Sequence, residues 1–369
     1  MLMWMLIFAA MFIAMVVGVV YIISRLCRME LVRGLANGNK HIQRLAVTAL
    51  TVLVIAAGYV LIGMINIAIM VVHALCVWLL LDVIFWLIRK KTGRSLSYDR
   101  AVLLNVLILI VYFGWGWYGA HHIVATQYSV ATQKEAEKLR IVQISDSHVG
   151  ATFDGEGFAE AVQKIQKEDP DIVVITGDFV DDDTSKEDML RSCEALGTLK
   201  ARYGVYFVFG NHDKGYSNQV RGYDAAELVR NLEENGVKVL EDETVSIGEH
   251  YYLIGRQDRS EESMGRSRAS MNELVQDLDQ NRYMIVLDHQ PNDFAAQEKS
   301  GVDLVLSGHT HGGQFFPINY LGEWMGENDM TYGIRQSGNT TFEVSSGISD
   351  WAIKFKTGCK AEYVILDIG

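Results

Sequence analysis

Aspartates, histidines and one asparagine recur in five short motifs along the C-terminal two-thirds of the chain. In chain order they are Asp146-Ser-His148, Gly177-Asp178, Gly210-Asn-His-Asp213, His289 and Gly308-His-Thr-His311. Two divalent cations held close together need a carboxylate that bridges them, with imidazole and carbonyl ligands to complete each sphere. Such a pair clamps a phosphate group and lowers the pKa of a bound water, so that hydroxide forms at neutral pH. The motifs therefore predict a two-metal centre suited to the hydrolysis of phosphate esters, which is very slow unaided.

Each motif follows a short apolar run. These runs are rich in β-branched and aromatic side chains, which predicts β-strands. They cover residues 141–145, 172–176, 205–209, 283–288 and 304–307. Because α/β folds bind ligands at the carboxyl ends of their strands, we expect the five motifs to meet at one edge of a sheet.

With all five motifs in order, residues from about 138 to 369 resemble the calcineurin-like metallophosphoesterase family. The longer string Gly308-His-Thr-His-Gly-Gly-Gln314 resembles a branch of that family common in membrane-attached bacterial phosphodiesterases. The resemblance implies a β-sandwich flanked by α-helices.

The resemblance also implies a role for each motif residue. The first metal would be held by Asp146, His148, Asp178 and His311. Asp178 would bridge to a second metal, whose sphere is completed by Asn211, His289 and His309. His212 would be catalytic rather than a ligand: it would face the phosphate and stabilise charge or protonate the leaving oxygen, with Asp213 orienting its ring. Carboxylate, amide and imidazole ligands suit manganese, iron or zinc, so we expect two divalent metal ions without a choice among these three.

Charge divides the chain into a basic front and an acidic remainder. The net charge is −12, but residues 1–125 hold ten Lys and Arg and only three acidic residues, a charge of +7, which leaves −19 for the rest. An acidic domain is a poor partner for a phosphate backbone. We therefore expect no nucleic-acid partner.

The first 122 residues predict a transmembrane region of four helices. Residues 2–23 and 101–120 are each long enough for one crossing. Residues 45–88 hold one formal charge, Asp82, and as a single helix would be about 66 Å long at ~1.5 Å per residue. That is twice the hydrocarbon thickness, so the segment must fold back, and we place the turn near residues 63–66. A cleaved signal peptide is the alternative for the first span, but no Lys or Arg precedes it.

All ten basic residues of this region lie in two segments, 25–44 and 89–100. With four spans both segments lie on the same side, which the positive-inside rule makes cytoplasmic. We therefore expect a multi-pass protein of the cell membrane with an extracytoplasmic catalytic domain. Asp82 is expected to reach toward residues 89–91 at the interface.

The remaining residues predict a linker over 123–138 and one domain over 139–369. Helical spacing near 156–168, 185–200, 224–235 and 271–280 alternates with the strands, as an α/β sandwich with outer helices requires. The acidic run 181–183 is expected to be a solvated loop. The four cysteines show no metal-binding or redox pattern, and a bridge between Cys193 and Cys359 is left open.

Two segments bear on the substrate. Residues 315–339 follow the last metal motif and are rich in aromatic residues and glycine, so we expect one wall of the cleft there. Its aromatic side chains could receive an acyl chain or a base, or could equally be packing residues. Relatives carry a phosphate-binding arginine after a Gly-rich turn, and residues 347–356 lack it. Lys354 or Lys356 could substitute for that arginine, but only as a point charge.

Together these features predict a membrane-anchored metallophosphoesterase, most simply a phosphodiesterase. Its substrate would be a phosphorylated small molecule or a lipid-linked phosphodiester or pyrophosphate, attacked by metal-bound hydroxide. The alternatives are a membrane receptor or scaffold that binds a phosphorylated ligand without turnover, and a transporter with an attached domain. The sequence does not predict the oligomeric state.

Overall fold

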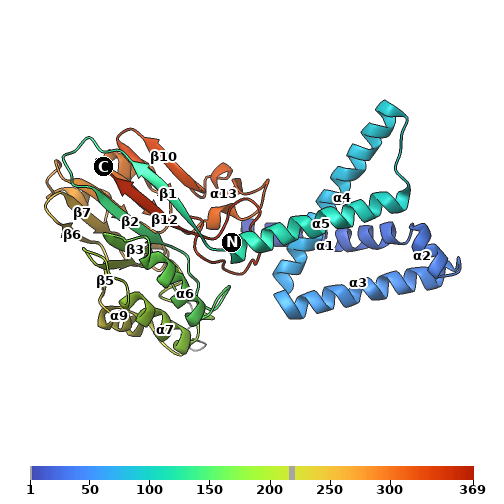
Figure 1. Ribbon diagram of the computed structural model, residues 1–369, viewed down its shortest axis with the longest axis horizontal. Coiled ribbons are helices and arrows are strands. Elements are labelled where there is room, and N and C mark those ends of the chain that lie inside the picture. The colour runs from blue at the N-terminus through green and yellow to red at the C-terminus, as the bar shows by residue number, and fades with distance from the viewer. Residues whose placement is uncertain (1, 216–220) are drawn as a thin grey trace. The chain divides into compact units, whose positions relative to one another are not determined.

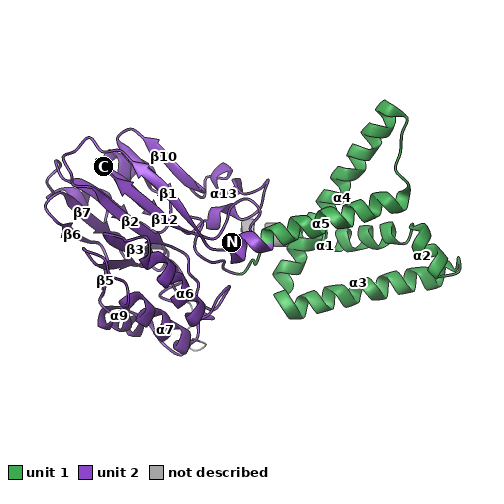
Figure 2. Ribbon diagram, viewed as in Figure 1, with its two compact units in different colours: residues 1–116, 352–354 green, residues 117–351, 355–369 purple. Residues whose placement is uncertain are grey.

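The computed structural model describes residues 2–215 and 221–369, in two compact units (Figure 2). One unit comprises Met1–Gly116 with Ala352–Lys354, and the other comprises Trp117–Trp351 with Phe355–Gly369. We describe them separately.

The first unit is helical. Its elements are α1 (Leu2–Leu26), α2 (Glu30–Leu35), α3 (Lys40–Ile62), α4 (Met64–Thr92) and α5 (Tyr98–His121), the last of which continues into the second unit (Figure 1). Four of these helices, α1, α3, α4 and α5, are long and apolar enough to cross a membrane. Large apolar side chains point outward from them: Leu61 and Ile110 are 75% and 64% exposed. Such outward apolar surface suits lipid rather than water. The turn expected near residues 63–66 is present at Gly63, whose φ of 82° separates α3 from α4.

Two polar side chains of α4, Asp82 and Asn66, bind partners outside that helix. Asp82 pairs with Arg25 and accepts a hydrogen bond from Tyr21, so the expected approach to residues 89–91 is wrong. The edge-to-face contact of Trp78 with Tyr21 shows why: α1 packs beside this part of α4. Asn66 is buried and binds the short stretch Ala352–Lys354, with Nδ2 donating to the carbonyl of Ala352 and Oδ1 accepting from the N–H of Lys354, both at 2.9 Å.

The second unit is built on two six-stranded sheets (Figure 1). The first sheet has the order β1-β12-β2-β3-β4-β5. Its strands are β1 (Val124–Val130), β12 (Glu362–Ile368), β2 (Leu139–Ile144), β3 (Ile172–Thr176), β4 (Val205–Val208) and β5 (Val237–Val239). The strands β2 to β5 run parallel, while β12 is antiparallel to β2 and parallel to β1.

The second sheet has the order β10-β11-β9-β8-β7-β6. Its strands are β10 (Gly333–Ser337), β11 (Thr340–Val344), β9 (Leu304–Ser307), β8 (Tyr283–Leu287), β7 (Tyr251–Gly255) and β6 (Glu243–Ile247). The four central strands are parallel, and an antiparallel strand closes each edge. Side chains such as Ile141, Ile285 and Leu306 fill one core between the sheets, as the alternation of strand side chains requires.

Helices cover the outer faces of this sandwich. The longer ones, α6 (Gly155–Gln166), α7 (Lys186–Gly197) and α9 (Ala225–Glu234), belong to a second core that contains Phe158, Leu196 and Phe207. Shorter segments are α10 (Ser260–Ser263), α11 (Met271–Val275), α12 (Phe294–Lys299), the 3-10 turn η1 (His311–Gly313) and α13 (Leu321–Trp324). The predicted fold class, a four-helix transmembrane-type region followed by a β-sandwich flanked by helices, is confirmed.

The predicted linker over residues 123–138 needs correction. Residues Val124–Val130 form β1, an edge strand whose alternate side chains are partly buried. The end of α5 is also part of the sandwich unit: Ala361 N–H donates to Gly119 O at 2.7 Å, and Val124 N–H donates to Ala361 O at 3.0 Å. The sandwich unit therefore begins at Trp117 rather than at residue 139. Cys193 and Cys359 are both free thiols, so no bridge joins them.

Candidate metal centre

The five motifs lie where five parallel strands end. Asp146 and His148 follow β2, Asp178 follows β3, and Asn211 follows β4. In the other sheet His289 follows β8, while His309 and His311 follow β9. Positive φ angles occur at five of these non-glycine residues: Asp146, His148, Asp178, His309 and His311. Such backbone strain, repeated at one place, is typical of a functional site held by its surroundings.

Among the described residues, three groups of side chains could each hold a metal ion. One of them, His148 with Asp181 and His212, includes the expected catalytic histidine, and the other two consist of predicted ligands only. Asp146, His148 and His311 form one group, and Asp178, His289 and His309 form the other, with the ligand atoms of each group within 4.8 Å of one another. Asp178 Oδ2 lies 3.5 Å from His148 Nε2 and 3.2 Å from His289 Nε2. The carboxylate of Asp178 thus lies between a histidine of each group, which is the place of a bridging ligand.

Several donor atoms at this place have no hydrogen-bond partner within the described residues. They are His148 Nε2, His289 Nε2, His311 Nδ1 and the Asn211 side-chain oxygen, and all four atoms are buried. A buried polar atom without a partner is costly. Coordination of cations would remove that cost, and the donor set of imidazole, carboxylate and amide oxygen is the one that manganese, iron or zinc accepts. The residues present therefore fit a pair of divalent metals.

Hydrogen bonds behind the ligands fix their orientation. His289 Nδ1 lies 2.8 Å from the carbonyl oxygen of Thr176, which leaves Nε2 for the metal side. The backbone N–H of His309 donates to Asp146, and the backbone N–H of His212 donates to Asp178 Oδ1 at 2.9 Å. Partners of this kind set the ring tautomer and the carboxylate direction.

Two glycines of the motifs allow the loops to approach one another. A Cβ atom on Gly210 would collide with Asp178, and one on Gly308 would collide with Ser145 and Asp146. Neither glycine could therefore be replaced without moving a proposed metal ligand.

The histidine expected to be catalytic, His212, contacts a different acid from the one predicted. Its Nδ1 lies 3.0 Å from Asp181 Oδ1. Burial alone would lower the pKa of His212, but the hydrogen bond with Asp181 and the charge of Asp178 outweigh it and raise that pKa to about 9. Asp181 also lies 3.2 Å from His148 Nδ1. The solvated-loop interpretation of residues 181–183 is therefore wrong for Asp181, which supports two histidines of the site.

Asp213 has a structural position. Its carboxylate is buried and accepts four backbone N–H groups, from Asp178 (2.8 Å), Phe179 (2.8 Å), Val180 (3.0 Å) and Gly210 (2.7 Å). These bonds tie the loop after β3 to the loop after β4. We therefore correct the prediction that Asp213 orients the ring of His212: Asp181 does so, and Asp213 holds the backbone that carries the bridging carboxylate.

Replacement of Asp213 by alanine is expected to destabilise the domain. Hydrogen bonds to a charged group contribute ~1.5–3 kcal/mol each, so loss of this set should cost at least about 3 kcal/mol of unfolding free energy. Urea unfolding of the variant beside Asp183→Asn, an exposed acid of the loop after β3, measures this. Unchanged stability with an altered pH profile of catalysis would instead restore the ring-orienting role.

A buried charge cluster behind His289 was not foreseen from the sequence. The carboxylate of Asp288 accepts hydrogen bonds from Arg256 Nη1 (3.1 Å) and Gln297 (2.8 Å) and also pairs with Arg268. These partners come from segments far apart in the chain, and no local motif marks them. They fix the residue that precedes a proposed metal ligand.

Lys356 does not take the place of a phosphate-binding arginine. Lys356 is fully buried, and its Nζ donates to the carbonyl oxygens of Ser346 (2.6 Å) and Ser349 (2.9 Å) and lies 3.3 Å from Asp350. Lys354 belongs to the helical unit, where its N–H binds Asn66. In the predicted wall 315–339, Phe315 is buried, whereas Phe316 and Trp324 are 64% and 71% exposed.

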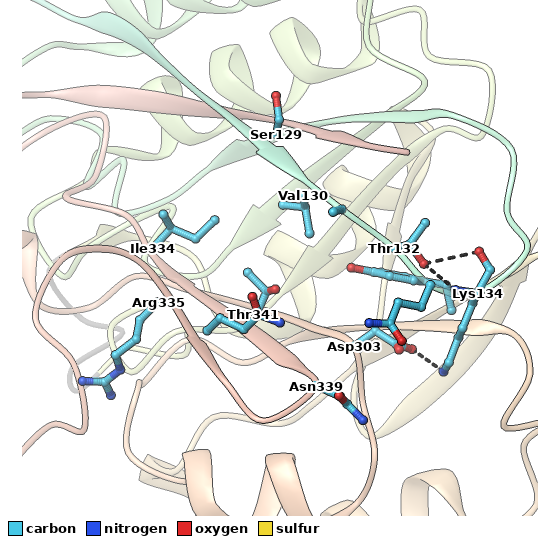
Figure 3. Close-up of a pocket in the computed structure, with 13 residues that line it drawn as sticks. Ser129, Val130, Thr132, Lys134, Asp303, Ile334, Arg335, Asn339 and Thr341 are labelled. Carbon is cyan, nitrogen blue, oxygen red and sulfur yellow. Dashed lines mark hydrogen bonds and ion pairs between the residues drawn. The ribbon is translucent and has the colours of Figure 1, made fainter.

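A cavity of about 620 Å³ lies elsewhere in the sandwich unit, between residues 129–134 and the β10–β11 hairpin (Figure 3). The Lys134 and Asp303 side chains point toward each other there, with Nζ and Oδ2 2.6 Å apart, while Arg335 points away from them. No residue of the five motifs lines this cavity. It is therefore not part of the metal centre.

Residues 139–313 match the family described as calcineurin-like phosphoesterase. An uncharacterized metallophosphoesterase of Bacillus subtilis, YkoQ, is 32% identical over 234 residues, which cover 61% of this chain and 82% of that protein. A transmembrane protein with metallophosphoesterase domain from Danio rerio is 31% identical over 297 residues, 74% of this chain and 65% of that protein. An uncharacterized metallophosphoesterase of Campylobacter jejuni is 29% identical over 231 residues, 62% of this chain and 59% of that protein. The match thus spans less than two-thirds of the Danio and Campylobacter proteins.

Proposed function

The chain belongs to the calcineurin-like phosphoesterase family, and we propose that it is a membrane-anchored phosphoesterase that uses two divalent metal ions to hydrolyse a phosphodiester or pyrophosphate. The observation that carries the proposal is the position of Asp178 between two groups of ligands. In these groups, ring nitrogens of His148, His289 and His311 are buried without a hydrogen-bond partner among the described residues. Asp146, His148, Asp178 and His311 would hold one ion, and Asp178, Asn211, His289 and His309 the other. Bound there, the pair would neutralise the phosphate and lower the pKa of a water molecule.

The protein's own groups have defined tasks in this proposal. Asp181 holds Nδ1 of His212, so we assign Nε2 of His212 as the atom that gives a proton to the leaving oxygen. Thr176 and the N–H groups of His212 and His309 keep the ligands in position. Asp213 keeps the two loops that carry Asp178 and Asn211 together.

A lipid-linked substrate is the form we favour. Its support is the presence of four helices suited to a membrane in the same chain, and of exposed Phe316 and Trp324 shortly after the proposed ligand His311. The two basic segments, 25–44 and 89–100, support an extracytoplasmic catalytic unit because four spans place both on the cytoplasmic side.

The test uses the full-length protein in detergent, stripped of metal by chelation and dialysis and then supplied with Mn²⁺. We expect hydrolysis of bis-p-nitrophenyl phosphate to be absent in the stripped protein and restored by Mn²⁺, and mixed micelles of phosphatidylglycerol to be hydrolysed as well. Turnover of p-nitrophenyl phosphate alone would overturn the diesterase assignment. Metal demonstrably bound without turnover of any ester would favour a protein that binds a phosphorylated ligand.

A further inference from the structure

One aromatic residue outside the five motifs lies at the proposed site. Trp351 stands in the long connection between β11 and β12, and its ring centroid is 5.5 Å from that of His212, with 50° between the planes. The Trp351 side chain is 48% exposed. An indole that touches the proposed proton donor and still faces outward offers a large, rigid apolar surface beside the reacting oxygen.

The residue before Trp351 is held by a buried polar network. Gln314 Nε2 donates to Asp350 Oδ1 at 3.1 Å, and Asp350 pairs with Lys356 at 3.3 Å. Asp350 and Lys356 have no solvent-exposed surface, and Lys356 also binds the carbonyl oxygens of Ser346 and Ser349. A buried ion pair contributes little net stability, but removing one of its partners is strongly destabilising. The network thus fixes the turn that carries Trp351.

The same connection touches the metal ligands from behind. The N–H of Ile348 donates to Ser145 O at 2.9 Å, and a Cβ on Gly347 would contact Asp146 at 2.7 Å. Trp351 is therefore placed relative to both the proposed ligand Asp146 and the proposed proton donor His212.

We propose that Trp351 forms a wall of the leaving-group subsite and selects a leaving group with a flat or apolar body, with Gln314, Asp350 and Lys356 as positioning residues. The inference rests on the proposed function. His212 gives its proton to the leaving oxygen, so the body attached to that oxygen lies beside the rings next to His212. Contact between a flat group and an aromatic side chain is favourable whatever the polar pattern of that group.

The test compares two diesters on the Mn²⁺-loaded full-length protein. Bis-p-nitrophenyl phosphate releases an aromatic group. Glycerophosphoglycerol releases a small polar group, and its hydrolysis is measured by ³¹P NMR. Trp351→Ala should lower kcat/KM for the aryl diester about tenfold or more, chiefly through KM, and for the glycerol diester less than about twofold. Trp351→Phe should recover most of the aryl activity. Ile334→Ala, an exposed apolar residue of the separate cavity, is the matched control and should change neither substrate.

The positioning residues are tested by removing both buried charges together, with Asp350→Asn and Lys356→Met in one protein, so that no buried charge is left unpaired. This variant should lose the same preference for the aryl diester, and adding Trp351→Ala should cost nothing further. If thermal unfolding shows that it does not fold, Gln314→Ala removes the hydrogen bond to Asp350 and takes its place.

Equal losses on the two diesters in Trp351→Ala would overturn the inference, since a purely structural residue lowers both. Additive losses in the combined variant would overturn the positioning role. Failure of the unaltered, metal-loaded protein on both diesters would count against the proposed function itself, so the two failures are distinguishable.

Discussion

Replacing Asp178 with asparagine is expected to lower kcat/KM for phosphodiesters at least about a thousandfold. The side chain keeps its size, but the charge that faces His148 and His289 is lost, and one of its two oxygens becomes an amide nitrogen. An amide cannot bridge two cations as a carboxylate does. Kinetics of hydrolysis of bis-p-nitrophenyl phosphate at saturating Mn²⁺ measures the effect.

The matched control for this variant is Asp183→Asn. It removes the same charge five residues further along the chain, at an exposed position. We expect it to retain normal activity. A variant at Asp178 that kept more than about a tenth of the activity would show that this carboxylate does not bridge the ions, because loss of one charge-stabilising group in an active site typically costs ~10²–10³ in rate.

Replacing His212 with alanine is the second large effect, and its size should depend on the leaving group. General acid catalysis contributes roughly 10²–10⁴-fold, and it matters most when the departing oxygen is too basic to leave unprotonated. We therefore expect a loss near the upper end of that range for alkyl esters and a smaller loss for p-nitrophenyl esters. A series of aryl and alkyl diesters gives the slope of log kcat/KM against the pKa of the leaving alcohol, which should become steeper in the variant.

Asp181→Asn provides the comparison. It leaves the His212 ring in place but weakens the hydrogen bond to Nδ1, so we expect a loss of about 10–100-fold, as for other groups that orient a functional side chain. A uniform loss across the ester series in His212→Ala would point to phosphate binding rather than proton donation.

The candidate site was predictable from the sequence because each of the five motifs follows its own strand at short range. A strand such as Ile172–Thr176 followed by Gly177 and Asp178 is a local pattern, and five such patterns in order define the set. The structure brings six of the seven proposed ligands into two groups, Asp146 with His148 and His311, and Asp178 with His289 and His309.

The supporting residues were not predictable in this way. Asp213 is next to His212 in sequence, yet its carboxylate turns away to four backbone N–H groups, while Asp181 from another loop takes the imidazole. The partners of Lys356 and Asp288 likewise depend on the folded path of the chain. The strand Val124–Val130 is not evident from the sequence because the adjacent polar residues Thr126 and Gln127 interrupt the alternation of apolar and polar side chains, although burial alternates along it as in an edge strand.

The most direct test of a two-metal centre is the metal content of the full-length protein. After loading with Mn²⁺ and removal of free ions by gel filtration, elemental analysis should give two manganese ions per chain for the unaltered protein and Asp183→Asn, and fewer than two for Asp178→Asn. Activity should rise with occupancy of the second ion. A single ion per chain in a fully active protein, or two ions retained in Asp178→Asn, would contradict a centre bridged by Asp178.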